Sequence, residues 1–270
     1  MGYTKVETYP YLKDLGARLH EYPTPAGLDA LTSPPYTDPV FSEIDLWLRT
    51  SASRFGSIFG YAQEQNGNTV QNLFPIKTDE TKQISSSSKV TLEMHTETAF
   101  HRYRPTTVLL LCVREDPDAG TNIAPLSRII ENLDEQTINA LKQPEFVTEI
   151  DESFRTDEYR TMPVETAVLS EDNQKIVYDR ALMVGTTSDA ESALTRLSEA
   201  VQKANETIYL KTGELLVMDN HTNVHGRTPF EARYDGTDRW LKRVLVTTQQ
   251  IPSHEIEWRE GRHRVITTAL

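Results

Sequence analysis

The stretch Gly213-Glu-Leu-Leu-Val-Met-Asp-Asn-His-Thr-Asn-Val-His-Gly-Arg-Thr-Pro-Phe230 says most about the fold. Residues 215–218 are all apolar and lead into Asp219, so residues 215–219 have the pattern and length of a buried strand. His221 and His225 follow that run, at the edge of the predicted core. Another strand is predicted at residues 240–248, directly downstream. The stretch therefore predicts a pair of strands with imidazoles between them.

Further short strand patterns and a few helix patterns lie upstream of this stretch. Apolar residues at helical spacing predict helices over residues 42–61, 126–141 and 188–205. Many short strands with a few covering helices are typical of a β-sandwich or jelly roll. The predicted strands before the last two are residues 69–76, 90–94, 106–114, 146–154, 164–169, 175–178 and 207–210.

Length and composition indicate a globular protein with one large domain. The chain has 270 residues. Prolines break up residues 1–40, which we expect to form an N-terminal arm, with a single domain over residues 41–270. The net charge of −12 disfavours nucleic acid and anionic lipid as partners.

Cysteine content and hydropathy favour a cytoplasmic protein. Cys112 is the single cysteine, so no intrachain disulfide can form, and we expect it to be a small buried apolar residue. The first ten residues show no apolar signal-peptide core, and no apolar stretch approaches the roughly 20 residues that span a bilayer.

A His-x-Glu pair, His95-Thr96-Glu97, follows the predicted strand at 90–94. Side chains at i and i+2 of an extended segment point to the same side, so one imidazole and one carboxylate converge. Such a pair alone is a weak signal, and a second distant imidazole is needed for a facial set of three ligands. Non-haem Fe(II) oxygenases use such a set and keep three adjacent positions open, which suit a bidentate 2-oxo acid and O₂.

The third ligand and a co-substrate anchor come from the C-terminal region. His20, His254 and His263 lie in polar segments near the termini, His101 follows His95 by six residues, and His221 and His225 both follow a core strand. Arg239 lies at the start of the next predicted strand. A forked, permanently charged guanidinium suits the distal carboxylate of 2-oxoglutarate.

Three segments together resemble the clavaminate synthase family, which includes free amino-acid hydroxylases acting on arginine, asparagine and lysine. The segments are LEMHTETAFHRYRP at 92–105, DNHTNVHGRTPF at 219–230 and RWLKR at 239–243. The resemblance runs from about residue 60 to residue 248 and is patchy between 115 and 175. It implies a mainly β fold: a double-stranded β-helix (jelly roll, cupin-like) core with flanking helices.

The resemblance also implies how cofactors are held. Fe(II) would be bound by His95, Glu97 and His225. 2-Oxoglutarate would be anchored by Arg239 and Thr121, and O₂ would be the oxidant. Glu97 is intact, whereas halogenating relatives carry a small residue at the carboxylate position, so oxygenation is favoured.

The implied substrate is a small amino acid. Arg243 would grip its carboxylate, Ser85 and Gln65 would hold its α-amino acid head, and Asp179 would bind the far end of its side chain. Val177 stands where arginine-specific relatives tend to have a second acid, which weakens but does not exclude a guanidinium substrate.

We therefore expect a dioxygenase that hydroxylates C3 of a free polar or cationic L-amino acid, releasing succinate and CO₂, in antibiotic or related biosynthesis. One alternative is desaturation or cyclisation by the same machinery. Another is a metal-binding jelly-roll sensor without turnover, although such a protein has no need of Arg239. A zinc hydrolase would also leave that arginine without a role. The oligomeric state stays open.

Overall fold

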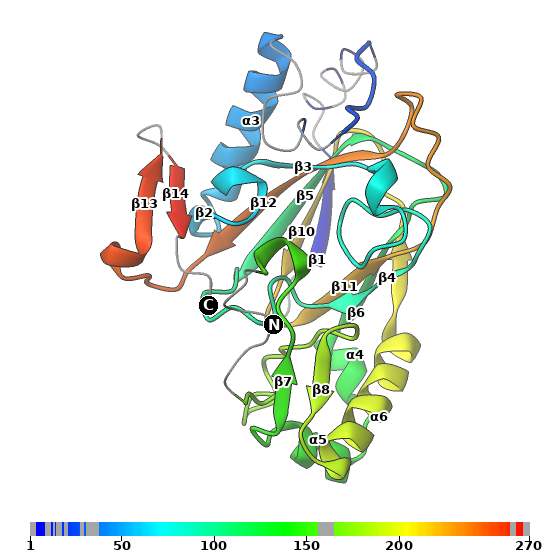
Figure 1. The fold of residues 1–270 in the computed structure, drawn as a ribbon, viewed down its shortest axis with the longest axis vertical. Helices are drawn as coiled ribbons and strands as arrows, with labels where there is room; N and C mark the ends of the chain where they lie inside the picture. The colour runs from blue at the N-terminus through cyan, green and yellow to red at the C-terminus, as the bar shows by residue number, and fades with distance from the viewer. Residues whose placement is uncertain are drawn as a thin grey trace.

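The computed structural model describes residues 4–8, 12, 14, 18, 21–27, 30, 38–155, 165–259 and 263–266. These residues form a mainly β structure with helices on its outside (Figure 1). Their strands make an eight-stranded, a four-stranded and a two-stranded sheet. The prediction of a mainly β fold with flanking helices is thereby confirmed.

The eight-stranded sheet has the order β1-β10-β5-β12-β2-β14-β13, with β3 also paired to β12. β5 lies near its centre and is buried on both faces, because Leu109 and Leu111 pack in one apolar cluster and Val108 and Leu110 in another. The strands are β1 (Thr4–Thr8), β2 (Ser57–Tyr61), β3 (Gln71–Leu73), β5 (Thr107–Arg114), β10 (Glu214–Asp219), β12 (Trp240–Thr247), β13 (Ile256–Arg259) and β14 (His263–Ile266).

The four-stranded sheet has the order β4-β11-β6-β9. Ile123 of this sheet packs with Leu110 and Leu216 of the large sheet, so part of the core lies between the two sheets. The strands are β4 (Leu92–His95), β6 (Thr121–Pro125), β9 (Glu206–Ile208) and β11 (Asn223–Arg227).

Helices cover the outer surfaces. Helix α3 (Pro39–Ala52) is capped by Asp38, whose carboxylate accepts from the Val40 amide, and it buries Ile44 and Leu48 against the large sheet. The other helices pack together at the opposite end of the molecule, beside the two-stranded sheet (Figure 1). They are α4 (Leu126–Ile130), α5 (Glu135–Leu141) and α6 (Ser188–Ala204), next to β7 (Phe146–Thr148) and β8 (Met183–Gly185).

Four short 3-10 helices complete the described elements: Gln65–Gly67, Lys77–Asp79, Glu152–Phe154 and Ser253–Glu255. No helix among the described residues is long and apolar enough to cross a membrane.

Several predicted elements differ from the observed ones. The helix predicted over 42–61 ends at Ala52, and its last five residues are β2. Gly56 separates the two with φ 145°, and its Cα lies so close to Thr247 that a Cβ would be 2.6 Å from the carbonyl oxygen. The helix predicted over 126–141 is divided, because Asp134 caps a new helix through the Thr137 amide.

Other predicted strands are weaker than expected. Of the strand predicted over 164–169, residue 164 lies outside the described residues. Residues 165–169 and 175–178 form only isolated bridges, Phe146 with Thr166 and Leu169 with Ile176. Within the predicted N-terminal arm, Thr4–Thr8 adds a strand to β10. The division at residue 40 and the single domain over 41–270 stay predictions.

Candidate functional site

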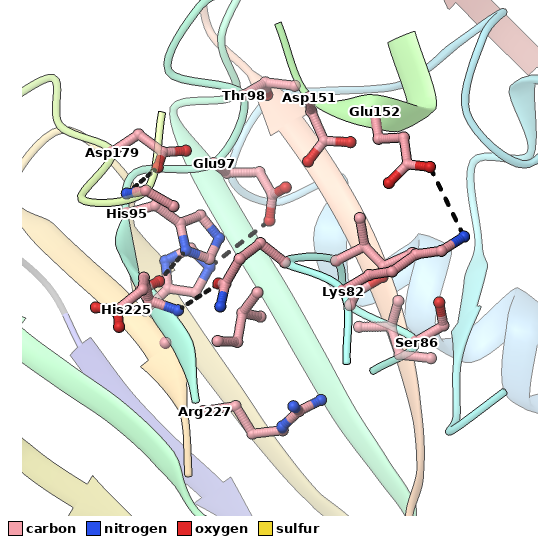
Figure 2. Close-up of a pocket in the computed structure, with 18 of the residues that line it drawn as sticks. Lys82, Ser86, His95, Glu97, Thr98, Asp151, Glu152, Asp179, His225 and Arg227 are labelled. Atoms are coloured by element: carbon pink, nitrogen blue, oxygen red, sulfur yellow. Dashed lines mark hydrogen bonds and ion pairs between the residues drawn. The ribbon is translucent and has the colours of Figure 1, made fainter. Parts of the chain in front are cut away.

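A cavity of about 710 Å³ is lined by residues of β4, β11 and β12 and of neighbouring loops (Figure 2). All nine residues that the sequence singled out for the site line this cavity. They come from separate strands and loops and are Gln65, Ser85, His95, Glu97, Thr121, Asp179, His225, Arg239 and Arg243.

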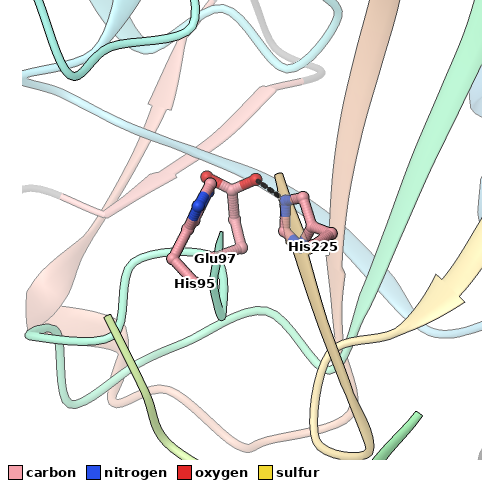
Figure 3. A group of neighbouring side chains, drawn as sticks. All are labelled: His95, Glu97 and His225. Atoms are coloured by element: carbon pink, nitrogen blue, oxygen red, sulfur yellow. Dashed lines mark ion pairs between the residues drawn. The ribbon is translucent and has the colours of Figure 1, made fainter. Parts of the chain in front are cut away.

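His95, Glu97 and His225 meet at one wall of the cavity (Figure 3). His95 at the end of β4 is the antiparallel partner of His225 on β11, and the two ring centroids are 4.5 Å apart. His225 Nε2 lies 3.7 Å from Glu97 Oε2. One donor atom from each residue lies within 4.8 Å of the others, so the three side chains could hold one metal ion.

Hydrogen bonds to the backbone orient these side chains. His95 Nδ1 donates to the Glu93 carbonyl oxygen at 2.7 Å, which leaves Nε2 free to bind a metal. The Glu97 amide donates to Asn220 Oδ1 at 2.7 Å, and Asn220 Nδ2 donates back to the Glu97 carbonyl at 3.2 Å. Thr98, next to Glu97, has a φ of 52°, a strained value for a β-branched residue.

The surroundings favour the protonation states that bind a metal. Burial acts to raise the pKa of Glu97, but the Arg243 guanidinium and both histidines outweigh burial and hold that pKa below its usual range. Burial, together with the neighbouring His95, lowers the pKa of His225. A carboxylate and a neutral imidazole are therefore both favoured near neutral pH.

Arg239 and Thr121 form a second feature of the cavity. Arg239 Nη2 donates to Thr121 Oγ1 at 2.9 Å, joining the start of β12 to the start of β6. Burial lowers the pKa of Arg239. No ion pair joins its guanidinium to an acidic side chain within the described residues, so it can receive the carboxylate of a ligand.

Arg243 is engaged by two carboxylates. Its Nη1 donates to Glu97 Oε1 at 2.9 Å, its Nε donates to Gln71 Oε1 at 2.7 Å, and its Nη2 pairs with Glu64. Glu64 and Gln71 were not predicted as site residues. Glu64 directly precedes the predicted Gln65, whereas Gln71 is opposite Arg243 only through the pairing of β3 with β12, which no sequence motif signals.

The other predicted substrate contacts are less uniform. Gln65 has its amide bonded to the Asn72 backbone, donating to the carbonyl at 2.9 Å and accepting from the amide at 3.1 Å. Asp179 Oδ1 accepts from the amides of residues 181 and 182, and burial raises its pKa. Ser85 is half-buried at the cavity wall.

Charged residues that the sequence did not single out also line the cavity. Arg227, on β11, is buried, and burial together with Arg239 lowers its pKa to about 9. Asp151 and Glu152 line the opposite side, where Lys82 lies 3.7 Å from Glu152 (Figure 2). Arg227 could have been identified as a site residue from the sequence, because it follows His225 by only two positions.

Two known proteins are similar to this chain in sequence, and their names agree with what the geometry of the site could do. The L-asparagine oxygenase of Streptomyces coelicolor is 36% identical over 203 residues, covering 74% of this chain and 61% of that protein. Clavaminate synthase 2 of Streptomyces clavuligerus is 30% identical over 203 residues, covering 73% of this chain and 62% of that protein. The chain thus spans about three fifths of the length of these relatives.

Structural comparison points the same way. A crystal structure of asparagine oxygenase with Fe(II), 2S,3S-3-hydroxyasparagine and succinate superposes with a TM-score of 0.79 at 29% identity, covering 96% of this chain and 85% of that one. The model of the taurine catabolism dioxygenase TauD, TfdA family matches residues 40–245. The resemblance to clavaminate synthase is therefore confirmed, and the chain belongs to the taurine catabolism dioxygenase TauD, TfdA family.

Proposed function

We propose that this protein is an Fe(II)- and 2-oxoglutarate-dependent dioxygenase that hydroxylates C3 of a free polar or cationic L-amino acid, with release of succinate and CO₂. One observation carries the proposal: the His95, Glu97 and His225 cluster shares a cavity with the Arg239–Thr121 pair. We also infer that the large and the four-stranded sheets together make the double-stranded β-helix of this family.

The three side chains fit a divalent iron. Two imidazole nitrogens and one carboxylate oxygen are the facial set of non-haem Fe(II) oxygenases, and one side of the set faces an open cavity. When bound, Fe(II) with the 2-oxo acid and O₂ supplies the oxidising chemistry for attack on a C–H bond. His95, Glu97 and His225 would hold the metal, with His95 kept in one tautomer by the Glu93 carbonyl.

The remaining charges define the place of the co-substrate. The Arg239 guanidinium presents hydrogen-bond donors and a positive charge at a half-buried position in the cavity, and the Thr121 hydroxyl adds a donor or acceptor beside it. These two residues would receive the distal carboxylate of 2-oxoglutarate. A metal site used only for sensing would have no use for such an anchor.

The substrate would lie between Arg243 and Asp179. Arg243 is the candidate for the substrate carboxylate, and it must release Glu97 or Glu64 to accept it. A carboxylate so released could take the α-ammonium group, a role that Ser85 would support more readily than Gln65, whose amide is occupied.

Two further acidic side chains face the proposed substrate site. Asp179 and Asp151 both line the cavity, and Asp151 is close enough to act electrostatically on Asp179 and on Arg243. This arrangement favours a substrate whose side chain ends in a cation or a hydrogen-bond donor. C3 as the position attacked is supported by the 3-hydroxyasparagine bound in the asparagine oxygenase structure.

The test is a mass-spectrometric screen of single amino acids, beginning with arginine, lysine, asparagine and glutamine. The enzyme is supplied with Fe(II), 2-oxoglutarate and air. We expect one amino acid to gain one oxygen atom in step with succinate release. Succinate release with loss of two hydrogens would favour desaturation or cyclisation, and bound iron with no succinate from any amino acid would favour a sensor.

A further inference from the structure

Arg227 stands out as a buried cation that the proposed reaction leaves without a task. It follows His225 by two positions on β11, and both side chains line the cavity. Its guanidinium stacks on the Phe230 ring at 5.1 Å from the centroid, and the residue is 4% exposed. A charge this deeply buried is costly unless its surroundings compensate for it.

The Arg227 guanidinium binds one loop through several donors. We call residues 85–90, which precede β4, the serine segment. Nη2 donates to Ser87 Oγ at 3.1 Å and to the Val90 carbonyl at 2.9 Å, and Nη1 donates to the Ser87 carbonyl. Nε donates to the Thr228 carbonyl at 3.1 Å. All these partners are neutral, so they satisfy hydrogen bonds without neutralising the charge.

The residues that follow β11 make a second contact with the serine segment. The Phe230 amide donates to the Ser88 carbonyl at 2.9 Å. The segment in turn places Ser85 and Ser86 at the cavity wall, where Ser86 Oγ donates to Asp79 Oδ2 at 2.7 Å. The strand with a metal ligand and the wall of the proposed substrate site are therefore joined through Arg227.

Arg227 also has a cationic neighbour. Arg227 is the antiparallel partner of Thr121, whose hydroxyl accepts from Arg239, and both arginines line the cavity. Within the described residues neither guanidinium forms an ion pair with an acidic side chain. Two like charges beside a cavity, one buried and one half-buried, favour an anion between or next to them. A dianionic 2-oxo acid would supply that compensation.

Resting on the proposed function, we infer that Arg227 is a positioning residue with two separable effects. Its charge strengthens binding of the anionic 2-oxo acid at Arg239, and its forked donors hold the serine segment in place for the amino acid. Lysine can replace the charge but not the planar fork, so the two effects can be separated by substitution.

Mn(II)-loaded protein titrated with 2-oxoglutarate in a calorimeter tests the charge effect. R227Q should bind 2-oxoglutarate about tenfold more weakly, whereas R227K should stay within about threefold of wild type.

Hydrogen exchange of the serine segment tests the role of the forked donors of Arg227. Both variants should exchange its amides faster, and KM for the amino acid should rise about tenfold in R227K. R128Q, which alters an exposed arginine paired with Glu206, is the matched control and should change neither quantity.

The inference is overturned if R227Q binds 2-oxoglutarate as tightly as wild type, or if R227K changes neither amide exchange nor KM for the amino acid. Should R227Q fail to fold, R227K and S87A carry the test: S87A should speed exchange of the serine segment without weakening 2-oxoglutarate binding, and unchanged exchange in both variants would overturn the inference. If wild-type protein itself binds no 2-oxoglutarate, the proposed function fails first, which is a distinct result.

Discussion

At the scale of single residues, Arg239 is the side chain with the most specific proposed task. It is half-buried, its guanidinium donates to Thr121, and it lies in the same cavity as the candidate metal ligands. Replacing it with glutamine removes the charge and the fork together. We expect R239Q to weaken 2-oxoglutarate binding roughly 100-fold, in the range for loss of a bidentate charged pair. KM for 2-oxoglutarate measures this, and an unchanged KM would remove Arg239 from the co-substrate site.

Cys112 offers a second test at this scale, and it involves pH. The side chain is 2% exposed, and burial raises the pKa of its thiol to about 12. The reactive thiolate is therefore absent from the native protein at pH 8 and would form only as pH approaches 12. We expect a thiol reagent at pH 8 to label native protein far more slowly than guanidinium-unfolded protein, where the single cysteine should react fully. Fast labelling of both forms would show that Cys112 is accessible.

At the scale of elements, the contact between β4 and β11 sets the spacing of the two imidazoles. Gly226 lies between His225 and Arg227, and a Cβ at this position would be 2.5 Å from the Leu92 carbonyl oxygen. G226A should therefore push the strands apart and lower Mn(II) affinity by about tenfold or more, because packed strands yield little. Metal titration with a thermal melt measures both effects. Wild-type metal affinity in a folded G226A variant would contradict this account.

Helix α6 gives a prediction about stability alone. Leu197 is fully buried against α4, α5 and the four-stranded sheet. L197A should lower the free energy of unfolding by about 2–5 kcal/mol, through lost burial and a cavity. Urea denaturation measures the change, and E199A on the exposed face of α6 should have little effect. An equally stable L197A would mean that α6 contributes little to the core.

Sequence patterns predicted elements well where one physical signal dominated. The uninterrupted apolar run of β5 and the amphipathic stripe of α6 were located within one residue at each end. Prediction failed where local patterns conflict with tertiary contacts. Phe55, Ile58 and Phe59 fit a helical period, yet the helix ends before Phe55, and after Gly56 the pairing with β12 places Ile58 and Phe59 in a strand. β11 was missed as a strand because its two neighbours, β4 and β6, lie far away in the sequence.

The same contrast applies to the site. His95 and Glu97 follow from i and i+2 spacing, and the family motifs supplied His225, Arg239 and Arg243. Nothing local could show that Glu64 and Gln71 surround the Arg243 guanidinium, because those contacts depend on how β3 lies against β12.

At the scale of the whole molecule, the sheets and helices share apolar clusters that cross element boundaries. One cluster joins α3 to the large sheet, one joins the two larger sheets, and one joins α4, α5 and α6 to the four-stranded sheet. If residues 41–270 form one domain, urea should unfold them in a single step. Tryptophan fluorescence and far-UV circular dichroism should then give coincident curves, and separated midpoints would indicate two independently folding parts.

The central claim is that two distant histidines and one glutamate hold iron beside a 2-oxo acid held by an arginine. The most direct measurement is the visible charge-transfer absorption that arises when a 2-oxo acid chelates Fe(II), recorded without O₂ on wild type and H225A. We predict that the absorption saturates at one iron per wild-type chain and is lost in H225A. Wild-type protein that binds Fe(II) and 2-oxoglutarate without this absorption, or an H225A variant that matches wild type, would contradict the account.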